Sequence, residues 1–158
     1  EMLRSLVGSE MCIRDRHYLA LVEGDWVNDR QHIKLGLSKW TTQSGERRVK
    51  VDPDGQTAHT IITLKQRFGG YSLVDAELRT GRTHQIRVHL AASGFPIVGD
   101  DKYGHDDVRA EFARAGFGRM FLHAHQLTLA HPVTGEPMTL TAELPPACRQ
   151  ILKQLESV

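Results

Sequence analysis

The chain has 158 residues, a formal net charge of +1 at pH 7 and 40% hydrophobic residues. That length fits one globular domain, and the small net charge means that a nucleic-acid partner would have to be bound by a local patch. No apolar run approaches the length of a membrane span, and Cys12 and Cys148 form no CxxC pair, which favours a reduced, cytoplasmic protein.

The pattern of apolar and turn-forming residues predicts alternating strands and helices. In chain order, we expect strands at 17–26, 47–51, 57–68 and 71–80, helices at 84–92 and 106–116, strands at 121–132 and 137–144, and a helix at 145–156. The strongest local signal is Gly69-Gly70, which predicts a hairpin between two of these strands. Neighbouring strands with helices between such pairs indicate an α+β fold with a mixed, largely antiparallel sheet and flanking helices.

The segment "LRTGRTHQIRVHLAASGFPIVGD", residues 78–100, places several arginines and histidines on one short helix. Thr83 is predicted to cap the helix, and Gly94 followed by Pro96 to end it. Arg82 then lies at the helix N-terminus, where free backbone N–H groups and the helix dipole favour a phosphate or a carboxylate.

Helical spacing also predicts where the side chains of this segment point. Ile86 and Leu90 stand four residues apart and should face the sheet, and Arg87 lies on a neighbouring row turned partly inward. A half-buried guanidinium needs a carboxylate or a phosphate to pair with it. The alternative is a surface helix with a solvated basic face.

Residues 78–104, "LRTGRTHQIRVHLAASGFPIVGDDKYG", resemble the signature of the RluA-type pseudouridine synthases, and most of all the C-type enzymes of large-subunit ribosomal RNA. "HYLALVEGDW" is similar to the tyrosine strand of that family, and residues 121–146 to its C-terminal strand pair. The resemblance runs from about Arg16 onward. Residues 16–158 are therefore identified as the C-terminal part of a pseudouridine synthase catalytic domain, incomplete at its N-terminal side.

The resemblance implies an isomerase that converts uridine to pseudouridine in ribosomal RNA. The base is detached at N1 and rejoined through C5, with no cofactor and no metal. It also implies that Tyr18 packs against the target base and that Arg87 pairs with a catalytic aspartate. The intact enzyme is expected to be monomeric, with RNA as its partner and no membrane association. The candidate RNA contacts are Arg82, His84, Gln85 and His89.

The aspartate segment of the family, His-Arg-Leu-Asp-x-x-Thr-Ser-Gly, has no match in the chain. Asp15 is too close to Tyr18 to replace it, and residues 1–15 read as a non-family junction segment. We therefore expect these 158 residues to be inactive, with Arg87 lacking its carboxylate partner. We also expect the strand that contains Tyr18 to be an exposed edge and the helix at 84–92 to be partly uncovered, which would make the chain only marginally stable.

Two other functions stay open on the residues alone. One is a non-catalytic RNA-binding module that uses the helix and its basic N-terminus. The other is a metal-dependent hydrolase built on His123 and His125, with His131 or the Asp100/Asp101 pair; without ligand-spaced carboxylates we expect hydrogen-bonded histidines at a sheet edge instead. Asp100 is predicted to order the turn after Pro96 beside Tyr103.

Overall fold

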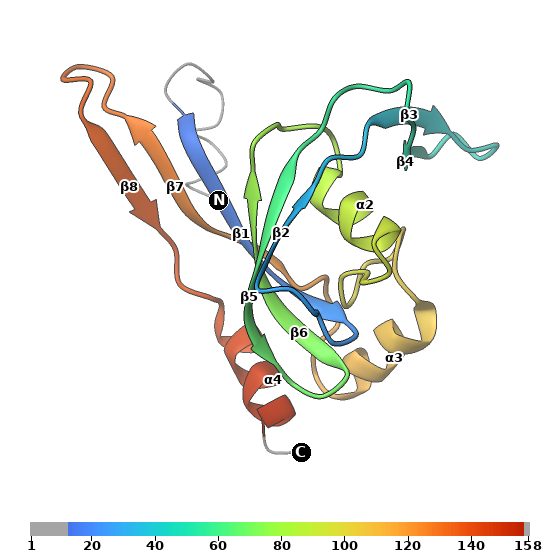
Figure 1. The fold of residues 1–158 in the computed structure, drawn as a ribbon. Coiled ribbons are helices and arrows are strands. Elements are labelled where there is room, and N and C mark those ends of the chain that lie inside the picture. Colours follow the sequence, from blue (N-terminus) through green and yellow to red (C-terminus); the bar gives the residue numbers. More distant parts are fainter. Residues whose placement is uncertain (1–12, 157–158) are drawn as a thin grey trace.

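The computed structural model describes residues 13–156, and Figure 1 shows their arrangement as an α+β fold, which confirms the predicted class. Residues 1–12, with Cys12 and most of the predicted junction segment, lie outside the described part of the chain. The strands are β1 (Ile13–Glu23), β2 (Arg30–Ile33), β3 (Leu37–Thr41), β4 (Arg47–Val51), β5 (Thr60–Arg67), β6 (Tyr71–Leu78), β7 (Leu122–Ala130) and β8 (Pro137–Thr141). The helices are α2 (Gln85–Ala92), α3 (Asp106–Arg114) and α4 (Pro146–Glu156).

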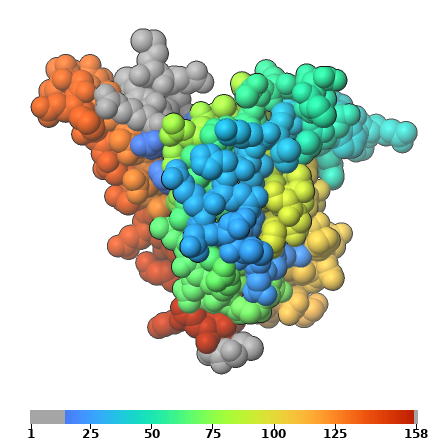
Figure 2. Space-filling model, in the orientation of Figure 1, coloured from blue at the N-terminus to red at the C-terminus, as the bar shows by residue number. Residues whose placement is uncertain are grey.

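Six strands form the main sheet in the order β2-β5-β6-β1-β7-β8, and β3 and β4 form a separate two-stranded sheet. All the strand pairings in both sheets are antiparallel. Figure 2 shows the β3–β4 and β7–β8 hairpins projecting from the body of the molecule. Among the described residues, no helix is long and apolar enough to cross a membrane.

β1 lies in the interior of the main sheet, so the prediction of an exposed edge strand is wrong. It pairs with β6 on one side and with β7 on the other. Ala20, Leu21 and Val22 are all fully buried, which shows that both faces of β1 are covered at this point. The two outer strands of the sheet are β2 and β8.

The two faces of the sheet carry different cores because successive strand residues point in opposite directions. One core joins Ala20, Val22 and Val74 to Ile86 and Leu90 of α2. The other core packs α3 and α4 against the opposite face, and its buried members are Leu21, Leu73, Val98, Phe112, Phe117, Phe121, Cys148 and Ile151. The prediction that Ile86 and Leu90 face the sheet is confirmed.

Helix α2 is covered on its second side as well. Val88 packs with Leu37 of β3 and Val49 of β4 in a small core of its own. The β3–β4 sheet therefore covers the helix that was predicted to be partly exposed. The sequence had indicated β4 as a strand, but neither β2 nor β3, both of which are short and largely polar.

The start of α2 differs from the predicted Thr83 cap. The N-cap is His84, in the left-handed conformation with φ 52° and without a side-chain cap hydrogen bond. Gln85 takes over part of this role, because its Oε1 accepts a hydrogen bond from the backbone N–H of Arg82 at 3.0 Å. The predicted end is confirmed: Ser93 is the C-cap and Gly94 follows with a positive φ of 90°.

Candidate functional site

Tyr18 and helix α2 lie on the same face of the main sheet. On β1, Tyr18 stands opposite Ala76 of β6 and Ala124 of β7. Its partly buried side chain packs against the core cluster that contains Ile86 and Leu90. The fold thus brings the two segments singled out in the sequence together, although 66 positions separate Tyr18 from His84.

Arg87 forms a two-pronged ion pair with Asp100. Its Nε donates to Asp100 Oδ2 at 2.9 Å, and its Nη2 donates to Asp100 Oδ1 at 2.6 Å. The Arg87 side chain is 12% exposed and that of Asp100 is 1% exposed. The prediction of a half-buried guanidinium paired with an anion is confirmed. The expectation that Arg87 would lack a carboxylate partner in this chain is wrong.

The Asp100 carboxylate is held by the turn that it organises, as predicted. The backbone N–H groups of Lys102 and Tyr103 donate to Oδ1 at 2.9 and 3.1 Å. The turn also requires glycine at position 99, because its φ is 82° and an added Cβ would clash with the Arg119 carbonyl oxygen. Burial opposes ionisation, but the Arg87 guanidinium and the two backbone donors outweigh it and lower the pKa of Asp100.

Tyr103 links this ion pair to the start of α2. The Arg87 guanidinium carbon lies 5.1 Å from the centre of the Tyr103 ring, a cation–π arrangement. The Tyr103 hydroxyl accepts from the Val49 N–H at 2.9 Å and lies 2.9 Å from His84 Nδ1. Partial burial, and next the nearby Arg87 charge, lower the pKa of His84, which favours the neutral imidazole.

The four predicted RNA contacts fall into two groups. Arg82 is exposed, and its Nε donates to the Thr57 carbonyl oxygen at 2.9 Å, while His84 is partly exposed at the helix start. Gln85 and His89 are 2% and 0% exposed. Because their side-chain nitrogen and oxygen atoms are all engaged inside the protein, direct contact between these two side chains and RNA is not available in this structure.

His89 and Gln85 instead tie the helix to the neighbouring strand. The Gln85 amide donates to Thr60 Oγ1 at 2.8 Å, and Thr60 Oγ1 lies 2.8 Å from His89 Nδ1. His89 Nε2 donates to the Leu35 carbonyl oxygen at 2.8 Å. Burial lowers the pKa of His89, so the neutral imidazole is favoured.

The two histidines considered for a metal-dependent hydrolase are both hydrogen-bonded, but to different partners. His123 Nε2 lies 3.0 Å from the Ala142 carbonyl oxygen, whereas His125 Nε2 lies 2.7 Å from Asp75 Oδ1. Their strand β7 sits between β1 and β8, so the expected sheet-edge position is wrong. His131 lies beyond the end of β7 and accepts from the backbone N–H groups of Val133 and Thr134.

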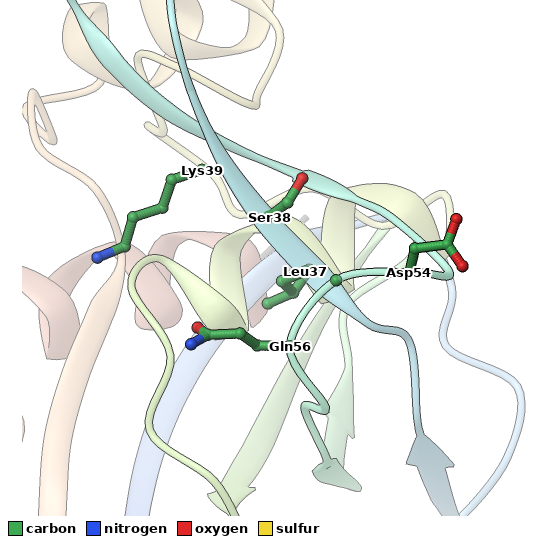
Figure 3. Close-up of a pocket in the computed structure, with 6 residues that line it drawn as sticks. Leu37, Ser38, Lys39, Asp54 and Gln56 are labelled. Carbon is green, nitrogen blue, oxygen red and sulfur yellow. The ribbon is translucent and has the colours of Figure 1, made fainter.

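An open hollow of about 430 Å³ lies between β3 and the turn that follows β4. Figure 3 shows the Lys39 and Asp54 side chains pointing away from one another, so the charged groups of the hollow do not converge. Neither Tyr18 nor Arg87 lines it. The hollow therefore carries none of the chemistry that the sequence indicated.

Comparison with known proteins identifies a family and several relatives that this chain resembles. The family model described as RNA pseudouridylate synthase matches residues 13–92, a range that includes Tyr18 and the whole of α2. The ribosomal large subunit pseudouridine synthase C of Haemophilus ducreyi is 43% identical over 142 residues, covering 90% of this chain and 44% of that protein. Its counterpart in Escherichia coli is 39% identical over 144 residues, 90% of this chain and 45% of that protein. The chain thus spans less than half the length of these relatives.

Solved structures show the same fold. Human RNA Pseudouridylate Synthase Domain Containing 1 aligns with a TM-score of 0.71 and 24% identity, over 98% of this chain and 70% of that one. Human RNA Pseudouridylate Synthase Domain Containing 4 aligns with a TM-score of 0.69 and 22% identity, over 98% and 66% of the two chains.

Proposed function

Because the chain belongs to the RNA pseudouridylate synthase family, we propose that residues 16–158 are the C-terminal part of a catalytic domain that isomerises uridine to pseudouridine in large-subunit ribosomal RNA in the cytoplasm. The observation that carries the proposal is the family match over residues 13–92, which includes both Tyr18 and Arg87. The names of the relatives support the large-subunit RNA as substrate.

In this proposal Tyr18 provides an aromatic surface for the target base. A uridine must leave its stack to enter such a site, at a cost of roughly a few kcal/mol. Contact with an aromatic ring recovers about 1–3 kcal/mol per base. Tyr18 is suited to this because its side chain is partly exposed while the strand that carries it is held on both sides.

Arg87 is proposed to hold the catalytic aspartate that the family resemblance implies. Asp100 uses Nε and Nη2 of the guanidinium, and among the described residues no hydrogen bond uses Nη1. A guanidinium has five N–H donors, so one that is already fixed by Asp100 can still pair with a second carboxylate. Asp100 would then be a positioning residue that fixes the orientation of Arg87 before the aspartate meets it.

We further infer that the 158 residues alone form no pseudouridine, because the family's aspartate segment has no match within them. The test is to incubate this chain, and separately the product of the complete reading frame that encodes it, with unmodified large-subunit ribosomal RNA. Pseudouridine is then measured by mass spectrometry of the digested RNA. We expect product only from the complete protein. If the complete, folded protein forms none, the proposed activity is wrong; if the 158 residues form it and still do so after Asp15→Ala, the aspartate assignment is wrong.

A non-catalytic RNA-binding module is the second candidate, favoured by the exposed guanidinium of Arg82 at the helix N-terminus. Under either function, Arg82→Ala should weaken RNA binding about equally for different sequences and reduce the slope of log K against log salt by about 1. Fluorescence anisotropy with short single-stranded RNAs at several salt concentrations measures both effects.

The matched control is Arg149→Ala on α4, which packs on the opposite face of the main sheet and carries an exposed arginine. This variant should leave the affinity and the salt slope unchanged. An equal loss in both variants would show that Arg82 has no specific role in binding RNA. The assay of pseudouridine described above distinguishes the binding module from the enzyme.

A further inference from the structure

Three side chains from neighbouring strands meet on the sheet face opposite Tyr18. His17 comes from β1, Asp75 from β6 and His125 from β7, and we call them the His–Asp–His cluster. His17 precedes Tyr18 on β1 and therefore points to the other face, the one that packs against α3 and α4. The cluster is thus separated from the proposed RNA site by the thickness of the sheet.

The carboxylate of Asp75 lies between the two imidazoles. Its Oδ2 is 2.8 Å from His17 Nδ1, and its Oδ1 is 2.7 Å from His125 Nε2. The exposed fractions of the side chains are 9% for Asp75, 22% for His17 and 19% for His125. The acid is therefore held inside the protein, and the histidines can be reached from solvent.

A local irregularity in β7 places the third member. The register between β1 and β7 pairs Tyr18 with Ala124 and His17 with Gln126, so His125 is the extra residue of a bulge. Bulges redirect side chains and often lie next to functional sites. In this case the bulge gives His125 access to Asp75 across β1.

We infer that the His–Asp–His cluster binds one divalent transition-metal ion of the zinc type. Imidazole nitrogen and carboxylate oxygen are zinc ligands, and the three donor atoms all lie within 4.8 Å of one another. Metal–ligand bonds of about 2.0–2.2 Å set the donor atoms of a tetrahedral site roughly 3.3–3.5 Å apart. To bind the ion, the two hydrogen-bonded donor pairs, now 2.8 and 2.7 Å apart, would have to open to that spacing by side-chain rotation, and the solvent-facing side would leave the fourth position to water.

The surroundings of the cluster favour a cation. Glu77 Oε1 lies 3.9 Å from His17 Nε2, the ring nitrogen that would face away from the metal. Metal-bound histidines commonly direct that second nitrogen at a carboxylate, which fixes the ring. Asp15 lies close by, and Arg79 pairs with both Glu77 and Asp15 at 2.8 and 3.8 Å. The two imidazoles, which bind metal in their neutral form, thus have three carboxylates around them, and Arg79 pairs with two of these, Glu77 and Asp15.

The bound ion would join β6, β1 and β7, three adjacent interior strands of the sheet, and would act on stability rather than on the RNA base. Such an ion stabilises the folded chain because the unfolded chain does not hold the three ligands together. This role is independent of the proposed synthase activity, so either proposal can fail without the other.

The test is isothermal titration of the tag-free, chelator-treated chain with Zn²⁺ alone, followed by thermal unfolding with and without the ion. We expect one Zn²⁺ per chain and a rise in Tm of about 5 °C or more at saturation. Asp75→Asn and His125→Gln should each weaken binding by at least about tenfold. The matched control His123→Gln, on the same strand but bonded to the Ala142 carbonyl oxygen, should bind as the unchanged chain does.

Substitution by Co²⁺ provides a readout that needs no variant. Tetrahedral coordination should give intense visible absorption bands, and the imidazole NMR signals of His17 and His125 should be the ones most strongly shifted. Absence of saturable Zn²⁺ binding to the folded chain would overturn the inference. Binding that survives Asp75→Asn and His125→Gln, or Co²⁺ shifts confined to other histidines, would overturn it as well.

Discussion

Asp100→Asn is expected to lower the free energy of unfolding by about 3–5 kcal/mol, because it leaves the half-buried Arg87 guanidinium without its counter-charge. Asparagine keeps the shape of aspartate and one carbonyl oxygen, so the backbone N–H groups of Lys102 and Tyr103 can still find an acceptor. The change removes the charge, and it also replaces Oδ2, the acceptor of the Arg87 Nε–H, with an NH₂ donor. Urea unfolding followed by circular dichroism measures the loss.

Asp101→Asn is the matched control for this prediction. Asp101 is the next residue and also lies near Arg87, but its contact is 3.4 Å long and its side chain is 62% exposed. An exposed pair of this kind contributes less than about 1 kcal/mol. If Asp100→Asn and Asp101→Asn had equal small effects, Arg87 would not depend on Asp100 for its position.

The same pair predicts a dependence on pH. The pKa of Asp100 is lowered in the folded protein, so its contribution to stability is present above the unfolded value of about 3.9 and is lost as the pH falls through the folded pKa. The difference in stability between the unchanged chain and Asp100→Asn should therefore be full at pH 7 and should shrink below about pH 4.

The sequence predicted this pair only in part. Helical spacing was enough to turn Arg87 inward, because the period of a helix fixes which residues share a face. It did not identify Asp100 as the partner, since Asp100 lies in a turn and the path of a turn is set by tertiary contacts. Gly99, directly before Asp100, has a positive φ and lies so close to the Arg119 carbonyl that a side chain would not fit, so this turn depends on a contact with a residue 20 positions further along the chain.

Strand order was also beyond the sequence. The segment around Tyr18 has apolar residues on both faces. This pattern fits an interior strand, and it fits equally well an edge strand whose neighbour is missing. Only the pairing of β1 with β7 shows which applies. The His–Asp–His cluster depends on the same long-range pairing, since His17, Asp75 and His125 come from three strands and have no common spacing in the chain. The sequence pattern drew attention to His123 and His125 together, whereas the structure separates their partners.

The second large effect is a loss of folding stability on acidification, which we expect to arise from His89. Its side chain is fully buried, and its Nε2–H donates to the Leu35 carbonyl oxygen, so Nδ1 accepts from the Thr60 hydroxyl. A proton on Nδ1 would remove that acceptor and place a charge in the core. Burial is the largest cause that lowers the pKa of His89, with the Leu35 carbonyl acting in the opposite direction.

Because the folded state disfavours the proton, the unfolded chain takes it up first. Stability should be at its full value above the unfolded pKa of about 6.5 and should fall as the pH is lowered beneath it. The slope can reach about 1.4 kcal/mol per pH unit for one proton, until the folded pKa is reached. Denaturant unfolding between pH 5 and 8 measures this slope directly.

His89→Gln should flatten the profile between pH 5 and 6.5, because glutamine does not titrate. It should also lower stability at pH 7, because it replaces a fully buried ring that bonds to both Leu35 and Thr60. Some slope should remain from His84, whose pKa burial also lowers. His105→Gln is the control of opposite sign: the pairing of His105 with Glu23 raises its pKa, so that contribution is present below about pH 6.5 and lost above it. If the pH profile of stability stays equally steep in His89→Gln, a group other than His89 causes the loss of stability in acid. The hydrogen bonds of His89 to Thr60 and Leu35 would then not be responsible for the pH dependence.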